Sequence, residues 1–244
     1  MKVIILAGGE GKRLRSEAYN LPKTLRKANG RSLIRHILDN LDFVPPQDIC
    51  IVVRFMGEKV QEELGPAYAY AWQDVHKGTG HALMCGADFV KDYDGDVLVL
   101  YGDMPMIKRE TYEAMIRSHA ASNASCTILS AVTEQESDFG RVIRDAGGQY
   151  VEVVEARDCT AEQLAVKEVN VGPNIYRAQD MLKHLPSLRA DNSQNEYYLT
   201  DLPAIMRRSG LAVNVHTITD ENEILGVNTM EDLEKCERIL KTRK

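Results

Sequence analysis

The 244-residue sequence contains no long hydrophobic run. The first apolar stretch breaks at Gly8 after about five residues, which is too short for the core of a signal peptide. No later stretch approaches the roughly 18 apolar residues of a membrane-spanning helix. With 44% hydrophobic and 27% charged residues, the chain can bury a full core. We therefore expect a cytoplasmic globular protein with no membrane partner.

The sequence also lacks an excess of basic residues. The 30 Lys and Arg residues are outnumbered by 36 Asp and Glu residues, which gives a formal net charge of -6. General binding to nucleic acid or to a membrane surface needs a large excess of basic side chains. We expect no nucleic-acid partner, and any cluster of basic residues should serve a specific site.

Cysteine motifs for metal binding are also missing. The five cysteines show no C-x-x-C pair and no alternation with His, so they indicate a reducing compartment rather than a zinc site. They are Cys50, Cys85, Cys126, Cys159 and Cys236. The sequence has no evident repeat, low-complexity tract or long linker.

The pattern that is present is typical of an α/β fold. Four apolar runs, bounded by turn residues and separated by segments of helical period, predict buried parallel strands. These runs span residues 3–6, 49–53, 97–101 and 126–132. Between two later β-prone stretches, Gly147-Gly148 predicts a hairpin.

Two segments have a clear helical period. Ser32 is a candidate N-cap for the first helix, and the chain is expected to end in an amphipathic helix. The apolar face of the first helix holds Leu33, Ile34, Ile37, Leu38 and Leu41, and that of the last holds Met230, Leu233, Cys236, Ile239 and Leu240.

A glycine-rich segment, LAGGEGKRL, begins at the end of the first apolar run. In open α/β sheets, ligands bind beyond the carboxyl ends of the strands, where glycines let backbone N–H groups approach phosphate oxygens. The segment is neither a Walker A loop nor a G-x-G-x-x-G motif, so an ordinary turn with solvated cations is an alternative. Together with Lys23, which follows Pro22, the loop predicts a cradle for a polyanion.

Two oxygen-bearing side chains are candidate cation ligands. Asp103 comes directly after the buried run 97–101, where a carboxylate either ties down a turn or binds a cation at the ligand edge of the sheet. Asn228 offers a neutral oxygen, with a helix N-cap as the alternative. One Asp is sufficient for Mg²⁺ if substrate phosphates supply further ligands.

Nine segments occur in the order and spacing of the sugar-1-phosphate nucleotidyltransferases: LAGGEGKRL, LPK, QDVHKGTGHAL, VLYGDMPMI, DFGRVIRD, VVEARD, KEVNVG, NEYYLTD and GVN. From about residue 2 to 230 the sequence resembles this family, and most nearly its bifunctional N-acetylglucosamine-1-phosphate uridyltransferase/acetyltransferase members, in their uridyltransferase domain. The resemblance implies a Rossmann-like, glycosyltransferase-A-type α/β fold with a mixed, mostly parallel sheet flanked by helices. It implies transfer of UMP from UTP to a sugar 1-phosphate, most nearly N-acetylglucosamine 1-phosphate, with Mg²⁺ as cofactor and release of pyrophosphate.

The same resemblance implies the site residues. Arg13 and Lys23 would act on the phosphates as catalytic residues, and Asp103 and Asn228 would hold Mg²⁺. The implied nucleotide-binding residues are Leu6, Ala7, Gly8, Gly9, Gln73, Gly78 and Thr79. The implied sugar-binding residues are Gly102, Gly140, Glu155, Asn170, Glu196, Tyr198 and Thr200. A Gln amide such as that of Gln73 can both donate and accept, which suits the edge of a pyrimidine.

Some positions depart from the family pattern. Lys12 stands where Thr is usual, a few extra residues separate Arg13 from Lys23, Val171 replaces a Thr, and Asn195 replaces a Gly. These changes leave open glucose 1-phosphate or another phosphorylated acceptor. A non-catalytic sugar-nucleotide sensor is the alternative from a different class, and joint retention of the four catalytic and metal residues argues against it.

The resemblance also implies the domain organisation. A nucleotidyltransferase domain would span residues 1–228, with a nucleotide-binding part at about 1–130 and a sugar-binding part at about 131–228, and a C-terminal helix would span 229–244. The sequence ends at Lys244 without the hexapeptide repeats of the acetyltransferase half. We therefore expect a stand-alone uridyltransferase whose oligomeric state the sequence leaves open.

Overall fold

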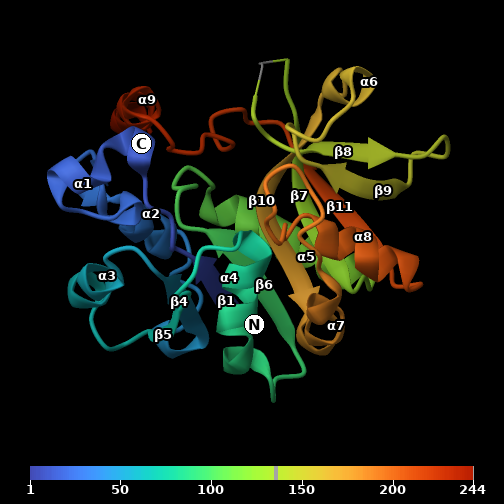
Figure 1. Ribbon diagram of the computed structural model, residues 1–244, viewed down its shortest axis with the longest axis horizontal. Helices are drawn as coiled ribbons and strands as arrows, with labels where there is room; N and C mark the ends of the chain where they lie inside the picture. The colour runs from blue at the N-terminus through green and yellow to red at the C-terminus, as the bar shows by residue number, and fades with distance from the viewer. Residues whose placement is uncertain (135–136, 244) are drawn as a thin grey trace.

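One mixed sheet forms the centre of the protein, in a computed structural model that describes residues 1–134 and 137–243 (Figure 1). Among these residues, nine strands join the sheet, with β8 and β9 attached as a hairpin beside β10 and the others in the order β11-β7-β10-β6-β1-β4-β5. The strands are β1 (Lys2–Leu6), β4 (Ile49–Val53), β5 (Ala69–Trp72), β6 (Asp96–Tyr101), β7 (Cys126–Val132), β8 (Arg141–Arg144), β9 (Tyr150–Val154), β10 (Glu168–Arg177) and β11 (Val213–Ile218). The short strands β2 (Lys27–Ala28) and β3 (Arg31–Ser32) pair separately.

The four apolar runs predicted as parallel strands all run in the same direction, and the antiparallel strand β10 comes from outside these runs. β1 runs parallel to β4 and β6, and β4 runs parallel to β5, as predicted for buried α/β strands. The last predicted strand, β7, is antiparallel to β10, and β10 is itself antiparallel to β6. β7 therefore has the same direction as β6, and it is parallel to its other neighbour, β11. Four of the six pairings along the main order are parallel, so the expected mixed, mostly parallel sheet is confirmed.

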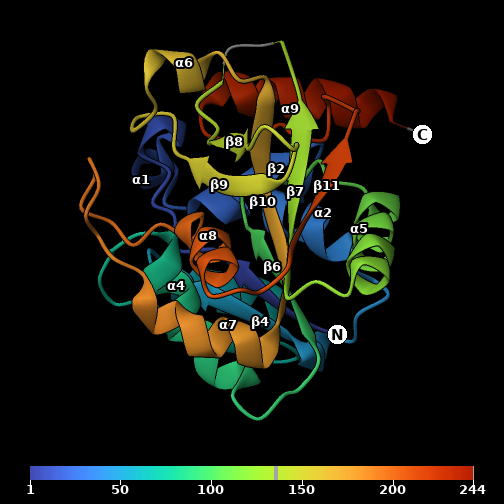
Figure 2. The same cartoon turned by 90° about the vertical axis from the view of Figure 1, so that its right-hand side faces the viewer.

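Alternate residues of the central strands pack against two layers of helices. Val3 and Ile5 face the layer of α2, α3 and α5, whereas Ile4 and Leu6 face α4, α7 and α8. Figure 2 shows α2 and α5 on one side of the sheet and α4, α7 and α8 on the other. These helices are α2 (Leu33–Asp39), α3 (Gly57–Leu64), α4 (Thr79–Gly86), α5 (Arg109–Ser122), α7 (Ala178–His184) and α8 (Asp201–Arg208). Burial of apolar side chains on both faces is what stabilises such a three-layer fold.

The remaining helices lie around this core. They are α1 (Ser16–Tyr19), α6 (Ala161–Leu164) and α9 (Met230–Thr242), with the 3₁₀ helices η1 (Lys12–Leu14), η2 (Lys23–Leu25), η3 (Pro46–Asp48), η4 (Ala87–Val90) and η5 (Leu185–Ser187). None of the helices in the described part of the chain is long and apolar enough to span a membrane.

The predicted terminal helix and hairpin are both present. Helix α9 buries Leu233 and Cys236 against Leu14 and Met106, and Figure 1 shows it lying over α1 and α2. Gly147-Gly148 joins β8 to β9, and Gly148 takes a φ of +76°. The implied division near residue 130 falls within β7, so the two parts share one continuous sheet.

The predicted cap of α2 is correct in position but not in its contacts. Ser32 occupies the N-cap position of α2 without a side-chain capping hydrogen bond. Its hydroxyl instead donates to Glu63 Oε1 at 3.3 Å. A tertiary partner has therefore replaced the local one that the sequence suggested.

Candidate active site

The carboxyl ends of four neighbouring strands meet at one edge of the sheet. Backbone hydrogen bonds extend the pairing one residue beyond β1, β5 and β6, from Ala7 N to Val52 O at 2.8 Å, from Gln73 N to Val53 O at 2.9 Å and from Gly102 N to Leu6 O at 2.9 Å. A cavity opens at this edge, and its lining includes all seven implied nucleotide-binding residues. Its walls are Leu6, Ala7, Gly8, Gly9, Lys23, Thr24, Gln73, His76, Gly78, Thr79, Ala82, Tyr101 and Asp103.

The glycine loop has one position where backbone conformation and space both require glycine. Gly11 has a φ of +69°, in the left-handed region that L side chains rarely adopt. A Cβ at Gly11 would lie 2.5 Å from Ser16 Oγ and 2.9 Å from Lys23 Cβ. The third glycine of the segment thus lets the loop close tightly on Lys23.

Lys23 joins the two implied metal ligands. Its ammonium Nζ lies 2.5 Å from Asp103 Oδ2 and 2.7 Å from Asn228 Oδ1, and its side chain is 10% exposed. A carboxylate and an amide oxygen converging on one buried ammonium form a donor set that already holds a cation. Oxygen donors of this kind are also those that Mg²⁺ prefers, so the residues present fit that ion.

Backbone contacts hold this group together across the chain. Asp103 lies two residues beyond the end of β6, and Val227 N donates to Asp103 O at 2.9 Å, which places Asn228 beside it. Asn228 precedes the capping box of α9, in which the Thr229 side chain accepts from Asp232 N. Thr229, and not Asn228, is therefore the N-cap of α9, and the Asn228 amide oxygen points to Lys23 instead.

The cations of the glycine loop are divided between two environments. Lys12 is exposed and pairs with Glu10 at 3.2 Å, and Arg54 pairs with the same carboxylate at 3.0 Å. These contacts, with the Arg54 hydrogen bond foremost, lower the pKa of Glu10. Arg13 instead lines a second cavity that also includes Asn228.

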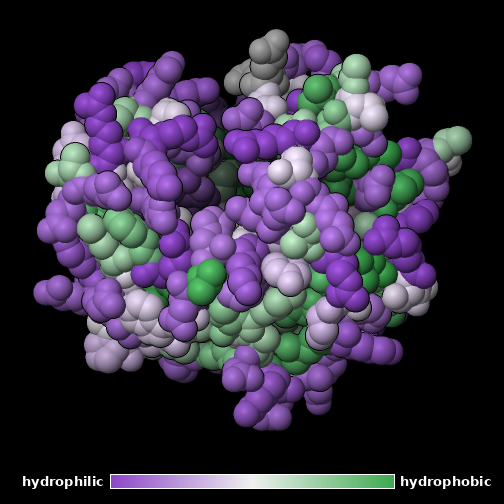
Figure 3. Space-filling model, in the orientation of Figure 1, coloured by the Kyte–Doolittle hydropathy of each residue, from purple (hydrophilic) through white to green (hydrophobic). Residues whose placement is uncertain are grey.

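We call this second cavity the acceptor cleft, after the sugar-binding role implied for Glu155 in its lining. It lies beside the first cavity, which we call the nucleotide cavity after the implied nucleotide-binding residues that line it. Figure 3 shows a hollow bordered mainly by hydrophilic residues between the part of the molecule that carries α1 and α9 and the part that carries β8 and β9. The cleft is lined by Arg13, Thr133, Ser137, Asp138, Phe139, Glu155, Ala156, Arg157, Gln194, Glu221, Ile224, Leu225, Gly226, Asn228, Thr229, Asp232 and Lys235. Because Asn228 lines the cleft and contacts Lys23 of the nucleotide cavity, the two cavities adjoin at this pair.

Of the implied sugar-binding residues, Glu155 reaches the acceptor cleft directly and others support it. Thr200 Oγ1 donates to Glu155 Oε1 at 2.7 Å, and a Cβ on Gly140 would lie 3.6 Å from Glu155 Oε2. Burial raises the pKa of Glu155, against a smaller lowering by the Thr200 hydrogen bond. Asn170 supports Gly140, because the Asn170 backbone N donates to Gly140 O at 2.8 Å.

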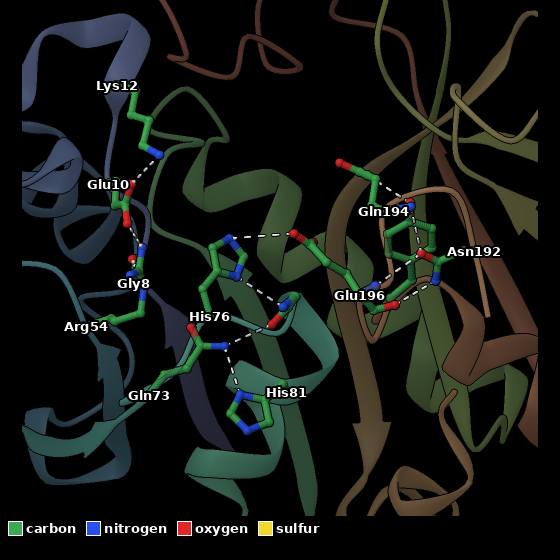
Figure 4. A network of polar contacts seen from close by, with 12 residues as sticks. Gly8, Glu10, Lys12, Arg54, Gln73, His76, His81, Asn192, Gln194 and Glu196 are labelled. Atoms are coloured by element: carbon green, nitrogen blue, oxygen red, sulfur yellow. Dashed lines mark hydrogen bonds and ion pairs between the residues drawn. The ribbon is translucent and has the colours of Figure 1, made fainter. Parts of the chain in front are cut away.

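The other three implied sugar residues lie further away. Tyr198 OH accepts from Gln194 Nε2 at 2.8 Å at the rim of the cleft. Glu196 Oε1 lies 3.8 Å from Nε2 of His76, and Figure 4 shows these two side chains facing each other. His76 lines the nucleotide cavity. Gly102 stands in the chain between Tyr101 and Asp103 of that cavity, and a Cβ on it would lie 2.8 Å from Thr24 Cγ2.

Sequence reasoning missed several residues that line the nucleotide cavity or contact its lining. Arg54 Nε donates to Gly8 O at 3.1 Å, and this arginine directly follows β4 at the same sheet edge, which was a usable signal. Tyr101 is the last residue of β6, so strand position also pointed to it. Thr24 and His76 carried no comparable signal.

The half-buried carboxyl of Asp201, close to Glu155, predicts a pH-dependent stability. Burial, and then the Glu155 charge, raise the pKa of Asp201 from 3.8 to about 6. The folded state therefore holds this proton more tightly than the unfolded state, and stability falls as pH rises from about 4 to about 6. We expect Asp201→Asn to raise the free energy of unfolding by about 1–3 kcal/mol at pH 7.5 and to change it little at pH 4.

Urea denaturation at the two pH values measures this effect. Asp191→Asn, in an exposed loop, is the control and should leave both values unchanged. An equal gain from Asp201→Asn at both pH values would show that the ionised carboxyl carries no such cost.

Comparison with known proteins shows the family of this chain. Residues 2–215 match the family model described as Nucleotidyl transferase, and the chain belongs to that family. The bifunctional protein GlmU of Solibacter usitatus is 38% identical over 246 residues, covering 100% of this chain and 52% of the relative. The bifunctional protein GlmU of Clostridium botulinum (strain Loch Maree / Type A3) is 36% identical over 241 residues, covering 98% of this chain and 52% of the relative. The chain thus spans about half the length of the curated relatives it matches.

A solved structure confirms the fold class. The crystal structure of a putative glucose-1-phosphate thymidylyltransferase from Bacillus anthracis, in complex with a sucrose, matches with a TM-score of 0.78. The match covers 100% of this chain and 96% of that chain. At 20% identity the likeness extends to the fold alone.

Proposed function

We propose that the protein is a Mg²⁺-dependent uridyltransferase that transfers UMP from UTP to a sugar 1-phosphate, with N-acetylglucosamine 1-phosphate as the acceptor. The observation that carries the proposal is the contact of Lys23 with Asp103 and Asn228 at the junction of the two cavities. The resemblance of the nine sequence segments implies the uridyl group and the N-acetylated sugar, and the bifunctional GlmU relatives, which match nearly the whole chain, support that resemblance. The acceptor cleft supplies a second, polar cavity of the kind that a phosphorylated sugar requires.

The reaction exchanges one phosphorus–oxygen bond for another. A phosphate oxygen of the sugar 1-phosphate attacks the α-phosphorus of UTP in line, and the bond to the β-phosphate oxygen breaks to release pyrophosphate. The nucleophile is already an anion, so the site needs no general base. Alignment of the two substrates is worth up to roughly 7–11 kcal/mol in well-oriented systems.

Residues of this chain supply the positioning and the charge. The glycine loop presents backbone N–H groups to the triphosphate, and Lys23 and Arg13 offset phosphate charge from the two cavities. Asp103 and Asn228 would hold Mg²⁺, which neutralises charge that develops on phosphate oxygens. With Mg²⁺ at these oxygens, the Lys23 ammonium would turn to the phosphates.

Pyrophosphate release tests the proposal. The protein is incubated with UTP, Mg²⁺ and each of four acceptors: the 1-phosphates of N-acetylglucosamine, N-acetylgalactosamine, glucose and galactose. We expect turnover with N-acetylglucosamine 1-phosphate to exceed that with the others. Preference for another sugar would correct the acceptor, and saturable binding of UDP-sugar without any pyrophosphate release would favour a sensor instead.

A further inference from the structure

The amide of Gln73 is fixed in one orientation inside the nucleotide cavity. Gln73 is 3% exposed, and its Nε2 donates to Gly78 O at 3.0 Å and to His81 Nδ1 at 3.2 Å (Figure 4). Because a backbone carbonyl only accepts, the NH₂ end of the amide must face Gly78. Both N–H groups of the amide then donate to acceptors within the protein, Gly78 O and His81 Nδ1.

The second acceptor requires a particular form of His81. For Nδ1 to accept, the ring must be neutral and must carry its proton on Nε2. Burial lowers the pKa of His81, and the nearby charges of Lys77 and His76 lower it further, so the ring is neutral near pH 7. His81 lies on α4, the helix that follows the Gln73 loop, with its ring 6.4 Å from that of Tyr197.

The carbonyl oxygen Oε1 of Gln73 remains available to accept a hydrogen bond from a ligand. Its Oε1 lies beside the glycine loop, since a Cβ on Gly8 would be 3.1 Å away, and both residues line the nucleotide cavity. A side chain that can only accept selects a partner that donates. Uracil and thymine carry a ring N3–H, whereas N3 of cytosine is a lone pair that would face the Gln73 oxygen and be repelled.

We propose that His81 is a positioning residue that holds the Gln73 amide with its oxygen toward the cavity, so that the site selects a pyrimidine with a ring N–H over cytosine. The inference rests on the proposed function, in which this cavity holds the base of a nucleoside triphosphate. The sequence suggested that the Gln73 amide could both donate to and accept from a base. With its NH₂ group engaged by Gly78 and His81, the amide can only accept. His81 touches Gln73 and is not required to touch the nucleotide.

Selectivity between UTP and CTP tests the role of His81. His81→Leu removes the acceptor, whereas His81→Asn offers an amide oxygen close to the position of Nδ1 and should restore it. We expect wild type to favour UTP over CTP by about ten- to a hundredfold in kcat/KM, from the cost of leaving a polar group unpaired. His81→Leu should lower that ratio about tenfold, mainly through the KM for UTP, and His81→Asn should recover most of it.

The control is His216→Leu on the edge strand β11, which should leave the ratio unchanged. An unchanged ratio in His81→Leu, or a wild type that prefers CTP, would overturn the inference while pyrophosphate release still upheld the nucleotidyltransferase. Absence of turnover with either nucleotide would count against the proposed function instead. Equilibrium binding of UTP and CTP then gives the same ratio without catalysis, and equal affinities would overturn the inference.

A spectroscopic signature of the wild-type protein completes the test, even if a His81 variant does not fold. Side-chain ¹⁵N NMR of His81 at pH 7 should show an unprotonated Nδ1 and a protonated Nε2. If Nδ1 instead carried a proton, it could not accept a hydrogen bond from Gln73 Nε2, and the proposal would be overturned.

Discussion

Asp103→Asn is expected to lower Mg²⁺-dependent kcat by about a hundred- to a thousandfold, the usual cost of losing one centre of charge stabilisation in an active site. The amide keeps the shape of the carboxylate and one oxygen near Lys23, so the fold should persist. What is lost is the negative charge that attracts a divalent cation to the Asp103–Asn228 pair. Steady-state pyrophosphate release over a range of Mg²⁺ concentrations measures the effect.

Asp94→Asn provides the matched control, because Asp94 is exposed near the opposite end of the same strand, β6. It should retain wild-type turnover and Mg²⁺ dependence. If Asp103→Asn also kept full Mg²⁺-dependent turnover, the assignment of Asp103 as a metal ligand would be wrong.

Lys23→Met is expected to have two opposite effects. It should lower kcat/KM by about a hundred- to a thousandfold, because an ammonium close to the phosphates is lost. It should also tighten divalent cation binding to the nucleotide-free protein, because Nζ no longer competes for Asp103 Oδ2 and Asn228 Oδ1. Calorimetric titration with Mg²⁺ and pyrophosphate release measure the two effects separately.

Lys27→Met, on the exposed face of β2, should change neither value. The combination of weaker catalysis and stronger metal binding distinguishes the bridging role of Lys23 from a general loss of positive charge. Metal affinity that falls along with activity would contradict the competition that the contacts indicate.

The sequence predicted four strands and their common direction, but not the strand that lies between two of them. The runs ending at Leu6, Val53 and Tyr101 became β1, β4 and β6 because buried apolar residues followed by glycine or charge mark strand ends strongly. Periodicity does not encode direction, which depends on how the chain crosses over. The antiparallel insertion of β10 between β6 and β7 was for this reason not foreseen.

Local sequence predicted some residues of the site, but it did not predict the contacts between residues that are far apart in the chain. Gly8 and Gly9 could be placed at the carboxyl edge of the sheet from local sequence, because they closely follow a buried strand. The contacts of Lys23 join residues 80 and 205 positions apart, and no local pattern fixes such distances. Glu196 and Tyr198 were found through the family resemblance alone, and Glu196 lies against His76 rather than on the acceptor cleft.

Phosphorus-31 NMR of one reaction tests the central claim most directly. The protein is mixed with UTP, N-acetylglucosamine 1-phosphate and Mg²⁺, and the spectrum is followed over time. We predict that the triphosphate and sugar-phosphate signals decline together while a nucleotide-sugar diphosphate and pyrophosphate appear in equal amounts. Unchanged spectra, or conversion of UTP to UDP and orthophosphate with the sugar phosphate untouched, would contradict the account.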